Sequence, residues 1–349
     1  MKSPAPRGPL SNALLTVLAG APEGAAEDLE LLYRQAEAQV EETRDIVADD
    51  DLQLVLFCLY ELHYSGLDGV DDQWEWEPEL LRVRRLLEGL FEAALRRAAG
   101  DAAEGLELGS AADSDQVADA LFRLAASDAG PSVSRYVARK ASLEQLKEFL
   151  VHKSIYQLKE ADPHTWAIPR LTGRAKAAMV EIQADEYGGG RPERMHSTLF
   201  ARTMRGLGLD DRYGTYVDAV PALSLAAVNL MSLCGLNRRL RGAIAGHLAI
   251  YEMTSSQPNR FYGNGFRRHG FGSDVTHYFD EHVEADAVHE QIAGRDLAGG
   301  LVEAEPGLLA DVIFGATAAM AIDARMSAHL VGSWENGRSS LRTAGPAAA

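Results

Sequence analysis

Apolar residues recur at intervals of three or four along almost the whole chain, and this spacing limits the fold more than any other feature. It is clear at Leu29, Leu32 and Ala36, and it recurs over residues 52–59 and 81–90. Such spacing places the apolar side chains on one face of an α-helix. Strand-like alternation is almost absent, and no internal repeat is visible. The chain is therefore predicted to be all-α, with about ten to twelve helices of ordinary length.

Two stretches rich in small and polar residues divide the chain into unequal parts. The first covers residues 100–115 and contains several glycines, and the second covers residues 128–132. Such stretches are typical of connections between helical units, and Ser132 suits the N-cap of the helix that follows. The predicted organisation is an N-terminal helical segment at about 20–128 and a main helical domain at about 131–335.

Prolines and glycines also indicate where the helices of the main domain end. The helices expected there are 143–160, 173–187, one from about Pro192, 217–236, 238–254, 275–295 and 305–333. The segment Gly263–Arg268 contains two glycines and two arginines. It follows no strand, so we interpret it as a plain interhelical loop rather than as a phosphate-binding loop.

The chain is strongly acidic, which restricts the partners it can have. It contains 34 Lys and Arg against 51 Asp and Glu, a net charge of −17. A charge of this sign repels phosphate backbones and anionic membrane surfaces. No apolar run approaches the roughly 18 residues of a membrane-spanning helix. We therefore expect a small-molecule substrate, no nucleic-acid partner and no membrane association.

The two cysteines, Cys58 and Cys234, both lie inside apolar helical patterns. Two are too few for a disulfide framework or a cysteine metal site, so we interpret them as buried small side chains of a cytoplasmic protein. The apolar stretch Ala13–Leu18 follows Lys2 and Arg7, as in a weak signal peptide. Because it is short and continues into a helical pattern, a first helix is the favoured interpretation.

The strongest local indication of chemistry is the spacing of His282, Asp286 and His289. Offsets of four and seven place the side chains of Asp286 and His289 within roughly 40° of that of His282 on a helix. Two imidazoles and a carboxylate suit non-heme iron and related divalent metals. From the composition, about 0.04 matches to this pattern are expected by chance. The alternative is a solvated helix face with incidental histidines.

Three further carboxylates are weaker indications when each is taken alone. Glu193 stands three residues before His196, a spacing used in dinuclear carboxylate bundles, but about 1.5 such pairs are expected by chance. Glu186 and Glu160 lie near expected helix ends, where glutamates are usually solvated. With Asp286 they form a set of four negative charges, which balances two ferrous ions. Without metal, a buried cluster of carboxylates would be strongly repulsive.

The runs Phe149–His164 and Glu181–His196 resemble the iron-containing redox enzymes of the heme-oxygenase-like fold, the heme-oxygenase-like diiron oxidases and oxygenases. The resemblance is strong over about residues 140–330 and looser at residues 59–64 in the N-terminal third. It implies an all-α, heme-oxygenase-like helical bundle with an N-terminal helical extension.

The metal ligands of that family follow a fixed order, which is a Glu, a second Glu, Glu-x2-His and His-x3-Asp-x2-His. The ligands that the resemblance implies here are Glu160, Glu186, Glu193, His196, His282, Asp286 and His289. The N-oxygenating members of the family carry an additional carboxylate at the position that Glu252 occupies here. The resemblance therefore implies Glu193 and Glu252 as the candidate catalytic residues. The alternative for Glu252 is a glutamate at a helix end, paired with Arg260 or Arg267.

The resemblance implies an oxidoreductase that binds two iron ions, which cycle between Fe2+ and Fe3+, with O2 as co-substrate. The chain has no flavin or nicotinamide fingerprint, so an external electron donor is expected. A homodimer is compatible with the sequence. Oxygenation of an amine nitrogen is the favoured reaction. The sequence leaves open oxidative C–C cleavage, decarboxylation or desaturation of an aliphatic acid, and also a cofactor-free or non-catalytic member of the fold.

Overall fold

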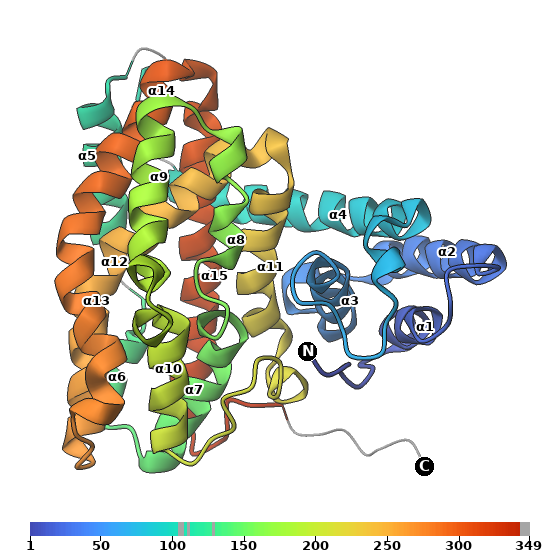
Figure 1. Cartoon of the computed structure of the whole chain (residues 1–349), viewed down its shortest axis with the longest axis horizontal. Coiled ribbons are helices and arrows are strands. Elements are labelled where there is room, and N and C mark those ends of the chain that lie inside the picture. The colour runs from blue at the N-terminus through green and yellow to red at the C-terminus, as the bar shows by residue number, and fades with distance from the viewer. Residues whose placement is uncertain (104–107, 110–111, 128–129, 343–349) are drawn as a thin grey trace.

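The computed structural model describes residues 1–103, 108–109, 112–127 and 130–342, and for residues 101–103 and 284–287 it describes the backbone alone. Every regular element in the described residues is a helix, which confirms the all-α prediction. Long, roughly upright helices form a bundle, and the N-terminal helices project from one side of it (Figure 1).

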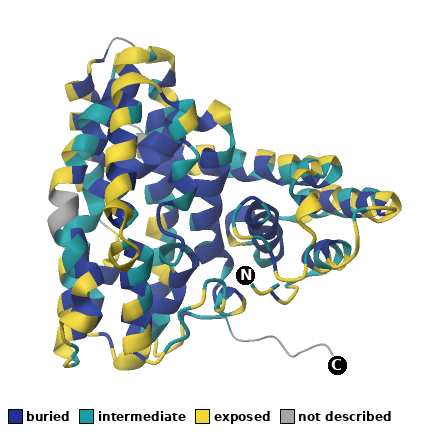
Figure 2. Ribbon diagram, viewed as in Figure 1, coloured by how far each residue is buried: buried dark blue, intermediate teal, exposed yellow. Residues whose placement is uncertain are grey.

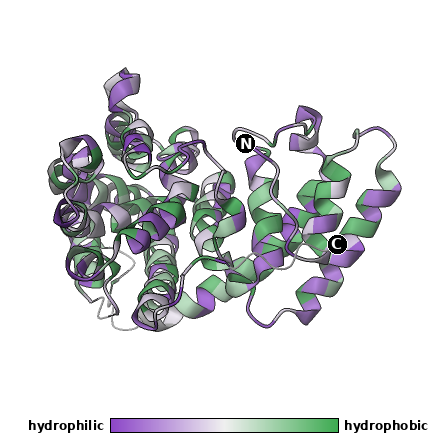
Figure 3. Cartoon of the chain, turned by 90° about the horizontal axis from the view of Figure 1, so that it is seen from below, coloured by the Kyte–Doolittle hydropathy of each residue, from purple (hydrophilic) through white to green (hydrophobic). Residues whose placement is uncertain are grey.

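The projecting helices form an N-terminal layer made of α1 to α4. Its helices are α1 (Pro9–Leu18), α2 (Ala26–Glu42), α3 (Asp50–Glu61) and α4 (Pro78–Ala103), with 3-10 segments at Ile46–Ala48 and Asp72–Trp76. In α1 the apolar residues Leu10, Leu14 and Leu18 are buried at a spacing of four. Asp49 caps α3 by accepting from two backbone N–H groups of its first turn. Figure 3 shows apolar and polar stripes on these helices, as amphipathic helices carry.

The main bundle contains the other helices. These are α5 (Ser114–Ala126), α6 (Val133–Arg139), α7 (Leu143–Gln157), α8 (Asp162–Thr165), α9 (Gly173–Glu186), α10 (His196–Gly206), α11 (Ala222–Leu236), α12 (Arg241–Arg268), α13 (Ser273–Gln291), the π-helix η8 (Ile292–Gly299), α14 (Gly300–Ala304) and α15 (Leu309–Glu335). Short 3-10 segments lie at Ile168–Arg170, Gly188–Gly190 (η4), Pro192–Arg194 (η5), Val217–Ala219, Arg238–Leu240 and Pro306–Leu308. The helix α12 packs along both α13 and α15, so it is central to the bundle.

The segment Gly263–Arg268 belongs to α12, so its interpretation as an interhelical loop is wrong. A Cβ atom on Gly265 would lie 2.6 Å from a methyl carbon of Val137 in α6. The glycine is therefore needed where two helices approach closely, and it does not end the helix. Pro258 also lies inside α12 rather than at its end.

The helix α5 lies in the main bundle, although the boundary predicted at about residue 128 assigned it to the N-terminal segment. Its residues Val117, Leu121 and Leu124 are buried, and it packs against η8 and α12. The two parts of the chain share one hydrophobic core, because α3 packs on α11 and α4 packs on α15. Figure 2 shows the buried residues running through the inner faces of the bundle and along α3.

The helices α12 and α15 approach each other most closely at Gly246 and Gly315. A Cβ atom on Gly246 would lie 1.9 Å from the carbonyl oxygen of Val312, and one on Gly315 would lie 1.9 Å from that of Ala243. The backbones of α12 and α15 are thus in direct contact.

The segment Pro306–Glu335 is long and apolar enough to cross a membrane, but half of its most apolar stretch is buried inside the protein, as in a core helix.

Substitution of Gly246 by Ala should destabilise the fold by about 3 kcal/mol or more, because the new methyl group would overlap the backbone of α15. Gly332→Ala is the matched control, since a Cβ atom there has nothing within 4 Å and the position is also helical. This control should leave stability unchanged or raise it by about 0.5–1 kcal/mol. Denaturant unfolding of both variants measures the difference, and equal midpoints would contradict the close contact.

Candidate metal centre

Side chains from separate elements meet inside the bundle and form two overlapping groups of potential metal ligands. Group 1 consists of Glu160, Glu186, His196 and His282, and one ligand atom from each lies within 4.8 Å of the others. All four residues are buried. They come from the turn after α7, the last residue of α9, the first residue of α10 and the middle of α13.

Group 2 consists of Glu186, Glu252 and His289, whose ligand atoms also lie within 4.8 Å of one another. Glu252 comes from α12. His289 comes from α13, about two turns beyond His282. Glu186 belongs to both groups. A carboxylate has two oxygens with several lone pairs, so one side chain in this position is able to contact two cations.

Hydrogen bonds determine which ring nitrogen of His282 and of His289 is left for a metal. Nδ1 of His282 lies 2.7 Å from the carbonyl oxygen of Tyr278, which only accepts, so Nδ1 donates to it, and Nε2 is the nitrogen that faces Glu160, 3.6 Å from one of its oxygens. Nε2 of His289 lies 3.0 Å from the carboxylate of Asp185, so Nε2 donates and Nδ1 is left. Such partners orient a ligating imidazole and raise its basicity.

Tyr278 contacts two members of group 1. Its hydroxyl lies 2.9 Å from each carboxylate oxygen of Glu160, and its carbonyl accepts from His282. Burial, with the nearby charge of Glu160, raises the pKa of Tyr278 far above its usual value. The phenol therefore stays protonated and donates to Glu160, which fixes the direction of that carboxylate.

Three histidine ring nitrogens in the described residues are buried without a hydrogen bond, and two of them face carboxylates. These two are Nδ1 of His196, 2.9 Å from an oxygen of Glu186, and Nδ1 of His289, 3.5 Å from an oxygen of Glu252. Ring nitrogens and carboxylate oxygens that converge in this way fit a cation between them once the rings are neutral. Imidazole nitrogen with carboxylate oxygen is a donor set that suits iron.

The imidazoles and carboxylates of the two groups shift one another's pKa and so favour one another's charged forms. Burial alone would raise the pKa of Glu186, but the surrounding imidazoles, His196 first, lower it to about 2. Burial alone would lower the pKa of His289, but the carboxylates of Glu252 and Asp185 raise it to about 9. In the metal-free protein the carboxylate of Glu186 is thus ionised, and a proton on His289 stands where a cation would bind.

Glu160 lies in a turn rather than in a helix. The helix predicted to continue to residue 160 ends at Gln157, and Ala161 has a φ of +79°, in the left-handed region. The side-chain amide of Gln183 in α9 donates to the carbonyl oxygen of Ala161 over 2.8 Å. The turn directs Glu160 into the bundle, and a contact from α9 holds it.

Glu193 lies outside both groups and is exposed. The three residues Gly188–Gly190 all have positive φ, and Glu193 then falls in η5. Met195 is extended, with ψ of 135°, before α10 begins at His196. The prediction that Glu193 and His196 share a helix turn is wrong, because the backbone between them is not helical.

Asp286 lies in α13 between His282 and His289. Its side chain is among those outside the described residues, so its predicted role as a ligand stays a prediction.

Glu252 lies in the middle of α12, because that helix continues to Arg268 instead of ending near residue 254. The side chain is buried and reaches group 2. Arg267, one of the arginines considered as its partner, pairs with Asp280 instead. This position favours the interpretation of Glu252 as an additional carboxylate of the metal centre.

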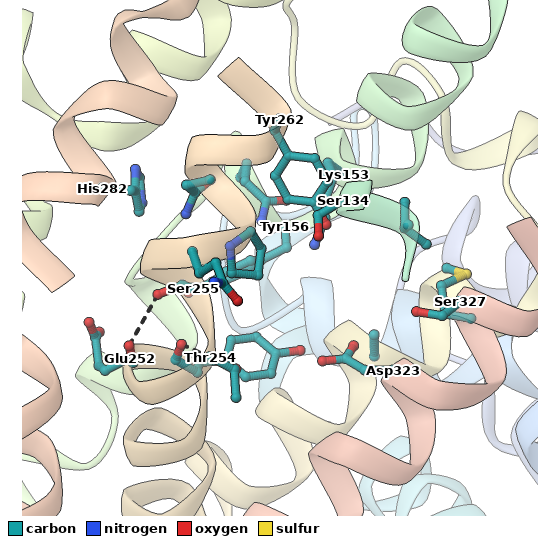
Figure 4. A pocket seen from close by; sticks show the side chains of 18 of the residues that line it. Ser134, Lys153, Tyr156, Glu252, Thr254, Ser255, Tyr262, His282, Asp323 and Ser327 are labelled. Atoms are coloured by element: carbon teal, nitrogen blue, oxygen red, sulfur yellow. Dashed lines mark hydrogen bonds between the residues drawn. The ribbon is translucent and has the colours of Figure 1, made fainter. Parts of the chain in front are cut away.

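A cavity of about 760 Å3 lies beside both groups, and Glu160, Glu186, Glu252 and His282 form part of its wall. Figure 4 shows Glu252 and His282 on one side of this cavity and Asp323 on the other. The remaining wall is mixed. Its apolar residues include Phe149, Val228, Met231, Leu248 and Leu330, and its polar and tyrosine residues include Ser134, Lys153, Tyr156, Tyr251, Thr254, Ser255, Tyr262 and Ser327. Such a cavity has the size for a small organic molecule.

Tyr278 and Asp185 are functional candidates that the sequence interpretation missed. Tyr278 stands four residues before His282, so helical spacing alone would have placed it on the same face. Asp185 directly precedes Glu186, and its partner His289 is 104 residues away. No local sequence pattern indicates the contact between Asp185 and His289.

The sequence matches the family of iron-containing redox enzymes over residues 147–324, just over half of the chain, and this range contains every member of groups 1 and 2. The chain belongs to this family. The resemblance stated from sequence is thus confirmed, as is the all-α, heme-oxygenase-like fold.

This iron-containing redox enzyme is 28% identical over 279 residues to the nitrosourea synthase of Streptomyces achromogenes subsp. streptozoticus. The match covers 76% of the chain and 58% of that relative. The chain therefore spans less than two thirds of the length of the relative it matches.

Metal binding to the metal-free enzyme should strengthen as the pH rises. Only a neutral imidazole binds metal, and the pKa of His289 is raised to about 9, so a proton must leave before a cation enters group 2. Between about pH 6 and 8.5, the apparent affinity for Co2+ should rise about tenfold per pH unit. Calorimetric titrations measure this slope. Asp185→Asn, which removes one cause of the raised pKa, should flatten it, whereas a wild-type affinity independent of pH would contradict the assignment.

Proposed function

We propose that this enzyme binds two iron ions and uses O2 to oxygenate a nitrogen atom of a small polar substrate. The observation that carries the proposal is the presence of Glu186 in both groups. A shared carboxylate is the feature that places two cations near each other, and dinuclear sites hold their ions about 3.5–4 Å apart.

Group 1 and group 2 supply the ligands for the two ions. One ion would be held by Glu160, His196 and His282, the other by Glu252 and His289, and both by Glu186. By the family resemblance, we propose that Asp286 and Glu193 complete the coordination. For Glu193 this requires a different conformation of the segment between α9 and α10 from the one described here.

Iron held by these ligands would supply the redox chemistry that O2 requires, and the protein residues position the reactants. Tyr278 directs Glu160, and Asp185 holds the ring of His289. Glu252 lies both in group 2 and in the cavity wall, so it is placed between the metal centre and a bound substrate. The apolar part of the wall, which includes Phe149 and Leu248, would limit the access of water to a bound substrate.

Polar groups on the far side of the cavity support nitrogen rather than an aliphatic chain as the point of attack. Asp323 and Lys153 both line the cavity, which suits a substrate that carries charge. The relative is named a nitrosourea synthase, which also supports a nitrogen-containing substrate. Oxidative C–C cleavage, decarboxylation or desaturation of an aliphatic acid is the rival reaction, and it would use the apolar part of the same wall, which includes Val228, Met231 and Leu248. A cofactor-free or non-catalytic protein would not need either group of ligands.

The proposed reaction requires an external electron donor. Conversion of an amine and O2 to a hydroxylamine and water takes four electrons into O2, of which the substrate supplies two. The other two, with two protons, must come from outside the chain. We therefore propose an electron donor as a partner of this enzyme. We also propose that the enzyme forms a homodimer and acts in the cytoplasm.

Anaerobic loading with Fe2+ should give about two irons per chain in the wild-type protein. Glu160→Ala and His289→Ala should each leave about one iron, because each removes a ligand of one group only. Glu186→Ala should lower both binding events, because this residue belongs to both groups. Glu88→Gln, another buried glutamate, is the matched control and should keep two irons. A wild-type protein with one iron, or equal loss in all three ligand variants, would contradict the dinuclear proposal.

The reaction itself is tested with small amines and with aliphatic acids under 18O2 and a chemical reductant. Mass spectrometry should detect a hydroxylamine that contains one 18O from the amines and no shortened acid or alkene from the acids. Asp323→Asn should raise KM for a cationic amine about tenfold, with a smaller effect on kcat, since it removes a negative charge from the cavity wall on the side away from Glu252 and His282. An alkene or a shortened acid as the main product would favour the rival reaction.

A further inference from the structure

Lys159 directly precedes Glu160 in the turn after α7, and the two side chains enter different surroundings. The side chain of Glu160 belongs to group 1, whereas the ammonium group of Lys159 pairs with the carboxylate of Glu61 at the end of α3. Both members of this pair are buried. The hydroxyl of Tyr213 donates to the same oxygen of Glu61 over 2.7 Å. The turn is therefore connected to the N-terminal layer.

Aromatic rings surround the ammonium group of Lys159. Its Nζ atom lies 4.1 Å from the ring centroid of Tyr64, 5.1 Å from that of Tyr213 and 5.5 Å from that of Phe57. These rings fix the position of the cation as well as offsetting its loss of water. The second carboxylate oxygen of Glu61 is buried without a hydrogen bond, so the burial of the pair is only partly offset. A buried pair of this kind contributes a defined geometry more than stability.

The opposite side of the same turn is connected to α9, the helix that ends with Glu186. Gln183 donates to the carbonyl oxygen of Ala161, and the hydroxyl of Tyr187 donates to Asp162 over 2.7 Å. Ala161 has positive φ, which residues other than glycine rarely adopt, so contacts on both sides are needed to hold it. The turn lies between the N-terminal layer and α9.

We propose that Glu61 and Lys159 are positioning residues for metal binding in group 1, so that the N-terminal layer takes part in building the metal centre. The pair holds the turn in the conformation that presents Glu160 beside Glu186 before a cation arrives. This inference rests on the proposed function only in that it takes each group to bind one ion.

Loss of the pair between Glu61 and Lys159 is expected to affect group 1 and not group 2. Glu160 belongs to group 1 alone, whereas group 2 is formed by Glu186, Glu252 and His289. Loss of the pair should therefore weaken one of two binding events and spare the other. General destabilisation of the protein would affect both.

The test is an anaerobic Co2+ titration of the full chain, followed by calorimetry and by the visible absorption of the bound ion. The double variant E61Q/K159M removes both charges and so leaves no unpaired buried ion. It should bind one Co2+ as the wild type does and the other at least tenfold more weakly, and the same absorption band should be lost as in Glu160→Gln. The variant Lys159→Arg keeps a cation opposite Glu61 and should bind both Co2+ ions as the wild type does.

Tyr60→Phe is the matched control. It removes a buried hydrogen bond to Glu88 from the same helix α3 without touching Lys159, so both binding events should be unchanged. Tyr213→Phe serves as a second, milder variant if the double variant does not fold by circular dichroism, and it should weaken the same binding event by a smaller factor.

Two binding events in the double variant within twofold of the wild type would overturn the positioning role. Equal weakening of both events, or an effect of Tyr60→Phe as large as that of the double variant, would also overturn it. A wild-type protein that binds one ion would contradict the dinuclear function instead. The positioning role is then decided by whether the double variant and Glu160→Gln weaken that single ion alike.

Discussion

The burial of the Glu186 carboxylate between two sets of imidazoles and carboxylates is the interaction on which the rest of the structure depends. Glu160, Glu186 and Glu252 are all buried, and like charges repel strongly in an interior of low dielectric. Imidazoles and the phenol of Tyr278 offset this repulsion in the metal-free protein. A frame that keeps these groups together against their repulsion must be rigid, and the direct contact of α12 with α15 contributes to that rigidity.

The parts of the structure that depend on local spacing could be predicted from the sequence. Helical periodicity indicated the all-α fold, and Ser132 caps α6 as its position suggested. The spacing of His282 and His289 placed both rings on one side of α13, and each ring reaches one of the two groups. These features need no knowledge of what packs against the helix.

The parts that depend on distant contacts could not be predicted in the same way. Gly265 reads as a loop residue, but it lies inside α12 because α6 approaches the backbone there. The glycines at Gly188–Gly190 do interrupt a helix, and this moves Glu193 away from the helix turn it was expected to share with His196. One residue type thus has opposite consequences, and only the neighbouring helix decides between them. The pairing of Asp185 with His289 is equally non-local.

The π-helix η8 begins directly after α13, three residues beyond His289, and joins α13 to α14. The continuous helical segment from Ser273 to Ala304 thus contains both α-helical and π-helical turns. The i→i+5 hydrogen bonds of η8 give wider turns than those of an α-helix. Gain or loss of a single amino acid within Ile292–Gly299 is therefore absorbed as a change of winding, downstream of His282 and His289. In α9, which ends with Glu186, the same change would rotate that carboxylate away from the bundle. A change of chain length after His289 would accordingly disturb the metal centre less than one before Glu186.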